Sequence, residues 1–369
     1  MSKVKLGDVA IEHKETCKGS KDGYPIVGLE HLIPEEVTLT AWDEGSDNTF
    51  TKMFRKGNVL FGRRRAYLKK AAVAPFDGIC SGDITVIEAI PDRILPELLP
   101  FIIQNDELFD FAVGKSAGSL SPRVKWEHLK NYEFELPDMD KQRELAELLW
   151  AMDATKKSYQ KLIAATDELV KSQFMEQFSM SQAESNGWSI VPVSSVVIKP
   201  LSGEWGQEDT DGTGVKVLRT TNFTDSGFID YTEVVRRSIE LKKVEAKALR
   251  DGDILIEKSG GSDTKPVGRV VFYQETSENF LFNNFTALLR PNTPKLNSRF
   301  LFTFLFVTYW NGGTKLYENK TTGIHNLKLA DYLVNTMIPI PPIEDQEVFA
   351  AFVEQSNKSK YNASQAMRL

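Results

Sequence analysis

Two segments of this chain repeat one pattern, in which a strand-like apolar run ends at a proline and acidic residues lead through a glutamine into an amphipathic helix. The first is LPDMDKQRELAELL at residues 136–149, and the second is IPPIEDQEVFAAFV at residues 340–353. Gln142 and Gln346 lie 204 positions apart (346 minus 142), and Pro137 and Pro341 keep the same offset. A fixed offset over such a distance predicts two copies of one structural unit.

Other pairs of similar segments support this duplication. Each copy has a short opening helix, a strand that leads into a polar turn, a Gly turn before an alternating strand with a basic end, and later a buried-looking helix. The pairs are residues 4–10 and 191–197, 24–33 and 215–224, 55–65 and 250–260, and 95–113 and 298–310. The pattern of strands and helices predicts an α/β (α+β) fold with two similar domains, at residues 1–136 and 188–340.

Composition limits the class of protein. A chain of 369 residues that is 41% hydrophobic and 26% charged is long enough for two domains with separate cores. No apolar run reaches the length of a membrane span and the N-terminus has no signal-peptide pattern, so we expect a cytoplasmic protein that does not bind membranes. Cys17 and Cys80, with four scattered histidines, match neither a disulfide framework nor a zinc site, and we predict no metal.

The net charge of −6 argues against indiscriminate coating of nucleic acid, but one stretch of the chain is strongly basic. Residues 55–70, RKGNVLFGRRRAYLKK, contain seven Lys or Arg and no acid, with Phe61 and Tyr67 between them. The simpler interpretation of such a run is a solvated basic strand and turn. The competing interpretation is a surface that neutralises phosphates.

A polar loop with small, hydroxyl and basic residues follows the buried-looking helix in each copy. The loops are GKSAGSLSPRVK at residues 114–125 and GGTKLYENKTTGIHNLK at residues 312–328. Small residues let a backbone approach phosphates, hydroxyls and amides read base edges, and cations add affinity, so the loops are suited to duplex DNA. They are not phosphate-binding P-loops, because Phe109 stands where the first glycine would be. A single loop could be a connector without a partner, but its recurrence favours binding.

These positions select the candidate DNA contacts. Arginine can bind guanine through two hydrogen bonds, whereas Ser, Thr and Lys serve phosphates as readily. The candidates in the first domain are Arg63, Arg64, Arg65, Lys69, Ser116, Arg123 and Lys125. The candidates in the second domain are Arg219, Thr220, Lys258, Lys265, Arg269, Lys320, Thr321, Thr322 and Lys328.

A long helix is predicted over residues 140–178, where apolar or compatible residues recur at alternating spacings of three and four. The seam positions are Leu145, Leu148, Met152, Thr155, Tyr159, Leu162, Thr166, Leu169 and Gln173. At 1.5 Å per residue the helix would be roughly 58 Å long, which favours a spacer between the domains. The offset places Phe349, Phe352, Ser356, Ser359, Ala363 and Ala366 on the seam of a second helix. We therefore expect an antiparallel coiled coil.

The second helix is shorter than the first, because Leu369 corresponds to Ala165 under the offset. Part of the first helix's apolar stripe would then lack a partner within the chain. Exposed apolar stripes of this kind mark interfaces. The predicted partner-binding residues are Leu169, Val170, Phe174 and Phe178.

The repeated helix openings, the KGNVLFGRRR and DGDILIEKSG strands and the two polar loops together resemble the specificity (S) subunit of type I restriction-modification enzymes, over essentially the whole chain. The resemblance implies target-recognition domains at 1–136 and 188–340, a central conserved helical spacer at 137–187 and a short C-terminal conserved helix at 341–369. It also implies that each domain recognises one half of a bipartite DNA sequence.

The resemblance further implies partners. The helices would dock methyltransferase (M) subunits, which carry S-adenosylmethionine, and a restriction (R) subunit would join to give the ATP- and Mg-dependent nuclease. No cofactor is expected on this chain. Where the partners are absent, we expect a second copy of the chain as the possible cover for the apolar stripe.

Catalysis by this chain is a competing hypothesis. An amino-methyltransferase needs an Asn/Asp-Pro-Pro-Phe/Tyr motif, and the nearest string, IPPIED at residues 340–345, has isoleucine at its first position. No glycine fingerprint follows a strand. We therefore predict a non-catalytic protein. The chain could also be the DNA-recognition subunit of another restriction-modification class, or a duplicated protein-binding scaffold, which dispensable basic loops would favour.

Overall fold

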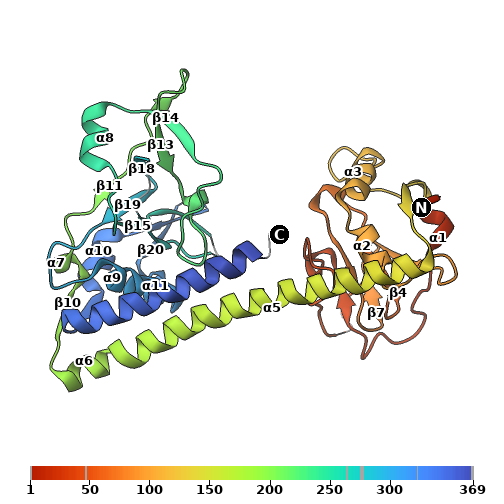
Figure 1. Ribbon diagram of the computed structural model, residues 1–369, viewed down its shortest axis with the longest axis horizontal. Helices are drawn as coiled ribbons and strands as arrows, with labels where there is room; N and C mark the ends of the chain where they lie inside the picture. The colour runs from red at the N-terminus through yellow and green to blue at the C-terminus, as the bar shows by residue number, and fades with distance from the viewer. Residues whose placement is uncertain (1, 46–47, 263–264, 275–277, 322, 367–369) are drawn as a thin grey trace. The chain divides into compact units, whose positions relative to one another are not determined.

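The structure is a computed structural model that describes residues 2–45, 48–262, 265–274, 278–321 and 323–366. The chain forms two compact units, Met1–Ser158 and Tyr159–Leu369. The boundary lies within the long helix α5 (Met139–Phe178), whose two halves belong to different units (Figure 1). The predicted helix over residues 140–178 is confirmed to within one residue. The long helices α5 and α11 (Ile343–Ala366) are thus parts of the two units.

The described residues of the first unit form three small sheets. The four-stranded sheet is antiparallel, whereas the three-stranded sheet includes one parallel pair, β3 with β7. In order across each sheet, the strands are β2 (Ala10–Glu12), β8 (Ile84–Ala89), β5 (Val59–Gly62) and β6 (Ala71–Val73); β3 (Ile26–Val27), β7 (Gly78–Cys80) and β4 (Lys52–Phe54); and β1 (Ser2–Lys5) with β9 (Glu133–Leu136). The helical elements are α1 (Leu6–Val9), η1 (Leu29–His31), η2 (Ala66–Leu68), α2 (Leu99–Ile103), α3 (Asp106–Gly114) and α4 (Trp126–Leu129).

The described residues of the second unit repeat the four-stranded antiparallel sheet and the two-stranded sheet, have a four-stranded sheet in place of the three-stranded one, and form a further three-stranded sheet that contains a hairpin. The antiparallel four-stranded sheet consists, in order, of β11 (Leu201–Ser202), β19 (Thr286–Leu289), β15 (Ile254–Glu257) and β17 (Val270–Phe272), and the other four-stranded sheet of β12 (Gln207–Glu208), β14 (Val235–Ser238), β13 (Val215–Leu218) and β18 (Phe280–Phe282). The two-stranded sheet pairs β10 (Ser189–Pro192) with β22 (Met337–Ile340), and the hairpin sheet consists of β16 (Ser259–Gly261), β21 (Ile324–Leu327) and β20 (Glu318–Thr321). The helices are α6 (Met180–Asn186), α7 (Val193–Val196), η3 (Thr220–Asn222), α8 (Leu241–Lys247), α9 (Ser298–Trp310), η4 (Lys315–Tyr317), α10 (Leu329–Asn335) and α11 (Ile343–Ala366).

Strand pairing confirms the duplication that the sequence predicts. The segments with similar sequences form corresponding elements, namely β5 and β15, β3 and β13, and α1 and α7. The pairs β3–β7 and β13–β18 are both parallel. In each unit the first strand pairs antiparallel with the strand that precedes the long helix, β1 with β9 and β10 with β22. The chain therefore folds as two versions of one mixed α/β unit.

The repeated glutamine explains the repeated sequence pattern. Gln142 is buried, donates from Nε2 to the carbonyl of Pro137 (2.9 Å) and accepts from the N–H of Leu95 (2.8 Å). Gln346 in the same way donates to the carbonyl of Pro341 (2.8 Å) and accepts from the N–H of Asn297 (2.9 Å). Each side chain satisfies buried backbone groups that would otherwise lose hydrogen bonds on leaving water. The glutamine thereby ties the end of the strand before its own helix to an earlier segment of the chain, the one that leads into α2 in the first unit and into α9 in the second.

The core helices differ between the units. The predicted helix at 298–310 is α9, and its side chains from Phe300 to Val307 are buried. The predicted continuous helix at 95–113 is wrong, because the chain forms the separate helices α2 and α3. Asn105 caps α3 by accepting a hydrogen bond from the N–H of Glu107 at 2.9 Å, a favourable start for a new helix. None of the helices in the described ranges has the length and apolarity that a membrane crossing requires.

The second half of α5 pairs with α11 inside the second unit (Figure 1). The ring of Phe178 lies 5.2 Å from that of Phe349, and Lys360 Nζ lies 2.5 Å from Asp167 Oδ1. Since the later residue of α5 contacts the earlier residue of α11, the helices run antiparallel. This confirms the predicted pairing of the long helices.

The expectation that the end of the α5 stripe lacks a partner within the chain is wrong for three residues. Val170, Phe174 and Phe178 are buried in the core of the second unit, where both phenylalanine rings pack against Phe300 of α9. Their spacing of four places them on a different face from the predicted seam. Leu169, which does belong to that seam, is 48% exposed. Helix α9, through Phe300, and the first part of α11, through Phe349, together cover these rings.

Candidate nucleic-acid interface

The basic turn and the polar loop of the first unit lie side by side. The turn begins where β5 ends, and the carbonyl of Arg63 accepts a hydrogen bond from the N–H of Val124 at 3.0 Å. The N–H of Arg65 donates to the carbonyl of Pro122 at 2.8 Å. Two segments that are about sixty residues apart in the sequence thus form one surface, which carries most of the candidate residues of this unit.

Two of its arginines share one carboxylate. Arg123 donates from Nε to Asp83 Oδ1 at 2.7 Å, and Arg64 places Nη1 3.4 Å from Asp83 Oδ2. The hydrogen bond from Arg123, assisted by the charge of Arg64, lowers the pKa of Asp83 and keeps it ionised. Arg64 also donates from Nε to Ser121 Oγ at 2.5 Å. Both guanidinium groups are held in place, yet about two-fifths of each side chain remains exposed.

The backbone of the basic turn has an uncommon conformation. Arg65 (φ 54°) and Lys69 (φ 51°) are both left-handed and flank η2. Residues other than glycine rarely adopt the left-handed backbone region, and backbone strain of this kind is concentrated at functional sites. Lys69 pairs with Asp106 at the start of α3, with 2.6 Å between Nζ and Oδ1. Arg63 has a buried Nε with no hydrogen-bond partner among the described residues.

The remaining candidates of the first unit lie at the ends of the loop. Ser116 donates from Oγ to the carbonyl of Ala112 at 2.8 Å, so its hydroxyl closes the last turn of α3. Lys125 is exposed where α4 begins. The oxygen of Ser116 keeps lone pairs available as an acceptor, whereas Lys125 offers a cation.

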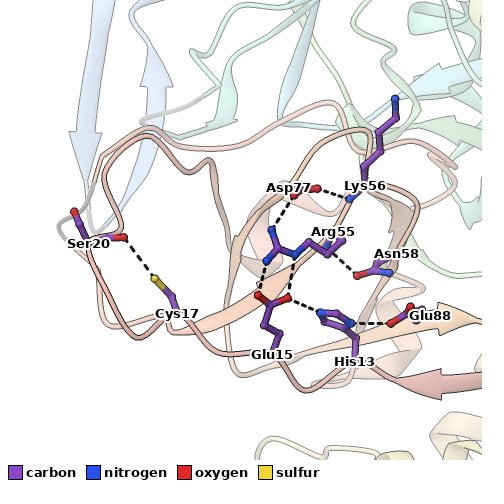
Figure 2. Close-up of polar contacts among 9 residues, drawn as sticks. All are labelled: His13, Glu15, Cys17, Ser20, Arg55, Lys56, Asn58, Asp77 and Glu88. Atoms are coloured by element: carbon purple, nitrogen blue, oxygen red, sulfur yellow. Dashed lines mark hydrogen bonds and ion pairs between the residues drawn. The ribbon is translucent and has the colours of Figure 1, made fainter.

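The first cation of the basic stretch has a structural role. Figure 2 shows the guanidinium of Arg55 between the carboxylates of Glu15 and Asp77, with Nε 2.9 Å from Glu15 Oε2 and Nη1 2.9 Å from Asp77 Oδ2. The hydrogen bond from Arg55 is the main cause that lowers the pKa of Glu15. The N–H of Arg55 donates to Asn58 Oδ1 at 2.8 Å and closes the turn before β5. The basic character available to a ligand is therefore concentrated at residues 63–65 and beyond.

The second unit joins its strand end and its loop with the same backbone contact. The carbonyl of Lys258, just after β15, accepts a hydrogen bond from the N–H of Leu327 at 2.8 Å. Lys258 thus corresponds to Arg63, and Leu327 to Val124. The side chain of Lys258 donates from Nζ to Ser202 Oγ at 2.8 Å, and burial lowers the pKa of Lys258. The loop contains the hairpin β20–β21, which the first unit lacks among its described residues.

A hollow of about 500 Å³ beside this contact gathers three of the candidates. Thr220, Lys265 and Arg269 line it together with residues that the sequence did not single out, namely Thr221, Phe223, Thr224, Asp225, Glu257 and Gly260. Lys265 is exposed and pairs with Asp225 at 3.2 Å. The hollow combines hydroxyl groups and the flexible cation of a lysine with two carboxylates.

Arg269 is an internal support of this hollow. Its Nε and Nη2 donate to the two carboxylate oxygens of Glu257 at 3.0 Å each, and Nη1 and Nη2 also reach the carbonyls of Phe223 and Thr220 at 3.1 Å. Burial by itself would lower the pKa of Arg269, but the hydrogen bond and charge of Glu257 outweigh it and raise the pKa. Because its donors are used within the protein, Arg269 positions Thr220 and Phe223.

The other candidates of the second unit are more dispersed. Arg219 lies beside a neighbouring hollow with Asp230 and Glu233, and its Nη2 donates to the carbonyl of Glu233 at 3.4 Å. Lys320 and Thr321 belong to β20, and Lys328 is exposed just before α10. Thr322 lies outside the described residues. The structure therefore brings together Thr220, Lys265 and Arg269 but not the whole predicted set.

Sequence reasoning missed two leucines in the loops, Leu120 and Leu316, which are 91% and 88% exposed. Their apolar side chains stand among small, polar and basic neighbours in the SAGSLSPR and GGTKLYEN segments. That contrast was the signal available in the sequence, because a leucine with nothing to pack against gains nothing in a solvated loop.

The comparisons with known proteins agree with this architecture. The family model described as "Type I restriction modification DNA specificity domain" matches residues 1–165 and 213–363. The chain is similar to the "Putative type I restriction enzyme MjaX specificity subunit" of Methanocaldococcus jannaschii, with 20% identity over 91% of this chain and 81% of that protein.

Two solved structures share the fold. One, described as "Structural basis underlying complex assembly and conformational transition of the type I R-M system", has a TM-score of 0.55 at 21% identity and covers 100% of this chain and 92% of that chain. The other, the type I restriction-modification S subunit from M. genitalium, has a TM-score of 0.56 at 11% identity with the same coverage. Both similarities support the two-unit α/β architecture with its paired long helices.

Proposed function

Because this chain belongs to the type I restriction-modification DNA specificity family and is the non-catalytic DNA specificity subunit of such a system, we propose that each of its two units recognises one half of a bipartite target. The observation that carries the proposal is the repeated junction of strand end and loop. In both units the residue after the central strand accepts a hydrogen bond from the end of the polar loop. Each unit therefore has its own copy of the surface.

The two copies differ in the side chains that they present. The first offers Arg64, Arg65 and Arg123, whose guanidinium groups can bind phosphates or guanine. The second surrounds a hollow with Thr220, Thr221 and Lys265. Two surfaces with one backbone plan and different side chains are suited to two different half-sites, so the complete target would be asymmetric.

The methylation subunits are expected to dock on α5. In this helix Leu148, Met152, Leu162 and Leu169 are 58%, 53%, 51% and 48% exposed, and they occupy positions of the predicted heptad seam. A stripe of large apolar side chains in water favours burial by a partner. Docking through Leu169 stays part of this proposal, whereas Val170, Phe174 and Phe178 are withdrawn because the second unit already buries them.

The chemistry is expected to reside on the partners. Methyltransferase subunits would carry S-adenosylmethionine, and a restriction subunit would supply the ATP- and Mg-dependent nuclease. This chain would determine the sequence of duplex DNA at which the partners act. In the absence of partners, the exposed α5 stripe would favour association with a second copy.

A map of methylated sites tests the proposal. The chain should be expressed with its methyltransferase and the modified bases located by sequencing of genomic DNA. We expect one sequence made of two short specific parts separated by a spacer of fixed length but arbitrary sequence. A single uninterrupted recognition sequence, or methylation without a common sequence, would contradict it.

A further inference from the structure

The two most exposed large apolar side chains of the described residues lie in the two polar loops, at the same distance in sequence from the helix that precedes each loop. They are Leu120, 91% exposed, and Leu316, 88% exposed. Helix α3 ends at Gly114 and helix α9 at Trp310, so each leucine is the sixth residue after the helix that precedes its loop. Isolated exposed leucines are common on protein surfaces. Two extreme cases at one repeated position indicate a shared purpose.

The loop around Leu120 is clamped at its base. Ala117 and Arg123 exchange two backbone hydrogen bonds, at 3.0 and 2.9 Å. Between them Gly118 has a φ of +116°, a conformation that other residues rarely adopt, and Ser121 is held by Arg64. The leucine is therefore presented at the tip of a closed loop, next to the two arginines that Asp83 positions.

Leu316 is also held outward by anchored neighbours. It is the middle residue of η4, in which the N–H of Tyr317 donates to the carbonyl of the buried Thr314 at 2.9 Å. The ring of Tyr317 packs on that of Tyr332 at 5.5 Å, edge to face. Thr314 and Tyr317 are thus fixed in the fold, while the side chain of Leu316 is exposed to solvent, next to Lys315 in the chain.

We infer that Leu120 and Leu316 are apolar contacts to DNA bases, one in each half-site, and this inference rests on the proposed function of the loops. The cations around them attract phosphates, which carry no sequence information directly. An apolar side chain can instead contact the methyl group of thymine or enter between two base pairs as a wedge. Either contact would bury a side chain that is otherwise hydrated, and would make these leucines determinants of specificity.

Binding measurements with the complete methyltransferase complex test the inference. Leu120→Ala and Leu316→Ala should each weaken binding to the mapped target about tenfold, which corresponds to ~1.4 kcal/mol. The slope of log affinity against log salt should stay that of the wild type, since a neutral side chain releases no counterions. Leu241→Ala is the matched control, because Leu241 is 78% exposed but belongs to α8 and to neither polar loop.

Two modified duplexes distinguish the kinds of base contact. With uracil in place of thymine in one half-site, a methyl contact predicts that the wild type loses the affinity that the alanine variant has already lost. With 2-aminopurine in that half-site, a wedge predicts increased fluorescence on binding the wild type and a smaller increase on binding the variant. Either result supports the inference. If affinity falls but neither signal appears, the leucines do not touch bases and the inference is wrong.

The fate of the arginines separates this inference from the function on which it rests. If the leucine variants bind like Leu241→Ala while Arg63, Arg64 and Arg65 still prove to contact DNA, the leucine inference fails and the interface stands. If replacement of the arginines also leaves binding unchanged, the interface itself is misplaced. Thermal unfolding of each variant within a few degrees of the wild type ensures that a loss of affinity reports on contact.

Discussion

Asp83 accepts hydrogen bonds from both Nε and Nη2 of Arg123, at 2.7 and 3.3 Å, and this pair links the polar loop of the first unit to Arg64 of the basic turn. A carboxylate among cations that are to meet DNA reduces the charge of the surface. In return it fixes the direction of the arginines and lowers the disorder that binding would otherwise have to remove. Asp83 therefore belongs to the candidate site although it repels phosphate.

Replacement of Asp83 by Asn should lower the preference for the target sequence and raise the affinity for DNA of any sequence. Asp83→Asn frees Arg64 and Arg123 and raises the net charge by one, so binding to random duplex should increase while the preference for the target falls several-fold. Competition between target and random DNA at a fixed salt concentration measures both changes. Asp92→Asn, an equal change of charge at an exposed residue that does not belong to the cluster of Asp83, Arg64 and Arg123, is the control. An undiminished preference would show that the arginines need no such support.

The same carboxylate predicts a pH dependence of stability. The folded-state pKa of Asp83 lies below its ordinary value, so its contribution to stability is complete above about pH 3.9 and is lost as the pH falls through the folded-state pKa. Asp83→Asn should therefore show a smaller loss of stability on acidification over that range. Denaturant unfolding of both proteins between pH 2 and 6 provides the test, and parallel curves would contradict it.

The three arginines of the basic turn should contribute by neutralising phosphates. Replacement of Arg63, Arg64 and Arg65 by alanine should flatten the dependence of log affinity on log salt by up to about 0.9 for each phosphate that is no longer neutralised. A folded triple variant with the wild-type slope would show that the cluster is a solvated turn. Lys56→Ala, in the same basic stretch but before β5, is a single-charge control.

Arg269 should behave differently from its neighbour Lys265. Arg269→Ala leaves the carboxylate of Glu257, which is 2% exposed, buried without its partner, and this should destabilise the second unit by about 3–5 kcal/mol. Lys265→Ala should affect DNA binding and leave stability within about 0.5 kcal/mol, because its ion pair is exposed. Chemical denaturation compares the two. Equal stability of both variants would mean that Arg269 is available to DNA after all.

The contrast between Arg269 and the arginines of the first unit shows where sequence reasoning was limited. Both were selected as basic residues beside a strand end. The partner of Arg269 is Glu257 on the neighbouring strand β15, twelve positions away, and only strand pairing brings them together. A basic residue whose donors are used within the fold and one that stays partly exposed have the same signature in sequence, and only the tertiary structure distinguishes them.

The long helices show the same limit in another form. The repeated Pro and Gln predicted the helix start because each glutamine binds the carbonyl of a proline only five residues earlier, which is a local contact. The buried face of α5 was less predictable, since Leu162 and Leu169 follow heptad spacing as well as any core residue yet are half exposed. Heptad spacing identifies an apolar face, but it does not say whether the chain or another molecule covers it.

Charged substitutions on that face should prevent assembly without unfolding either unit. Leu162→Glu with Leu169→Glu should weaken binding of the methyltransferase subunit at least tenfold, because two carboxylates would have to leave water at the interface. Light scattering of mixtures, with thermal unfolding as a check on folding, measures this effect. The control is Gln160→Glu with Glu168→Gln, at exposed positions outside the seam. Assembly as tight as that of the wild type would exclude this face as the docking site.

Exchange of a single recognition unit tests the account most directly. Residues 1–136 should be replaced by the corresponding segment of a relative with a different target, and the methylated sequence mapped again in cells that express the chimera with the methyltransferase. We predict that one half of the bipartite sequence changes to that of the relative while the other half stays the same. A change in both halves, or in neither, would contradict independent recognition by the two units.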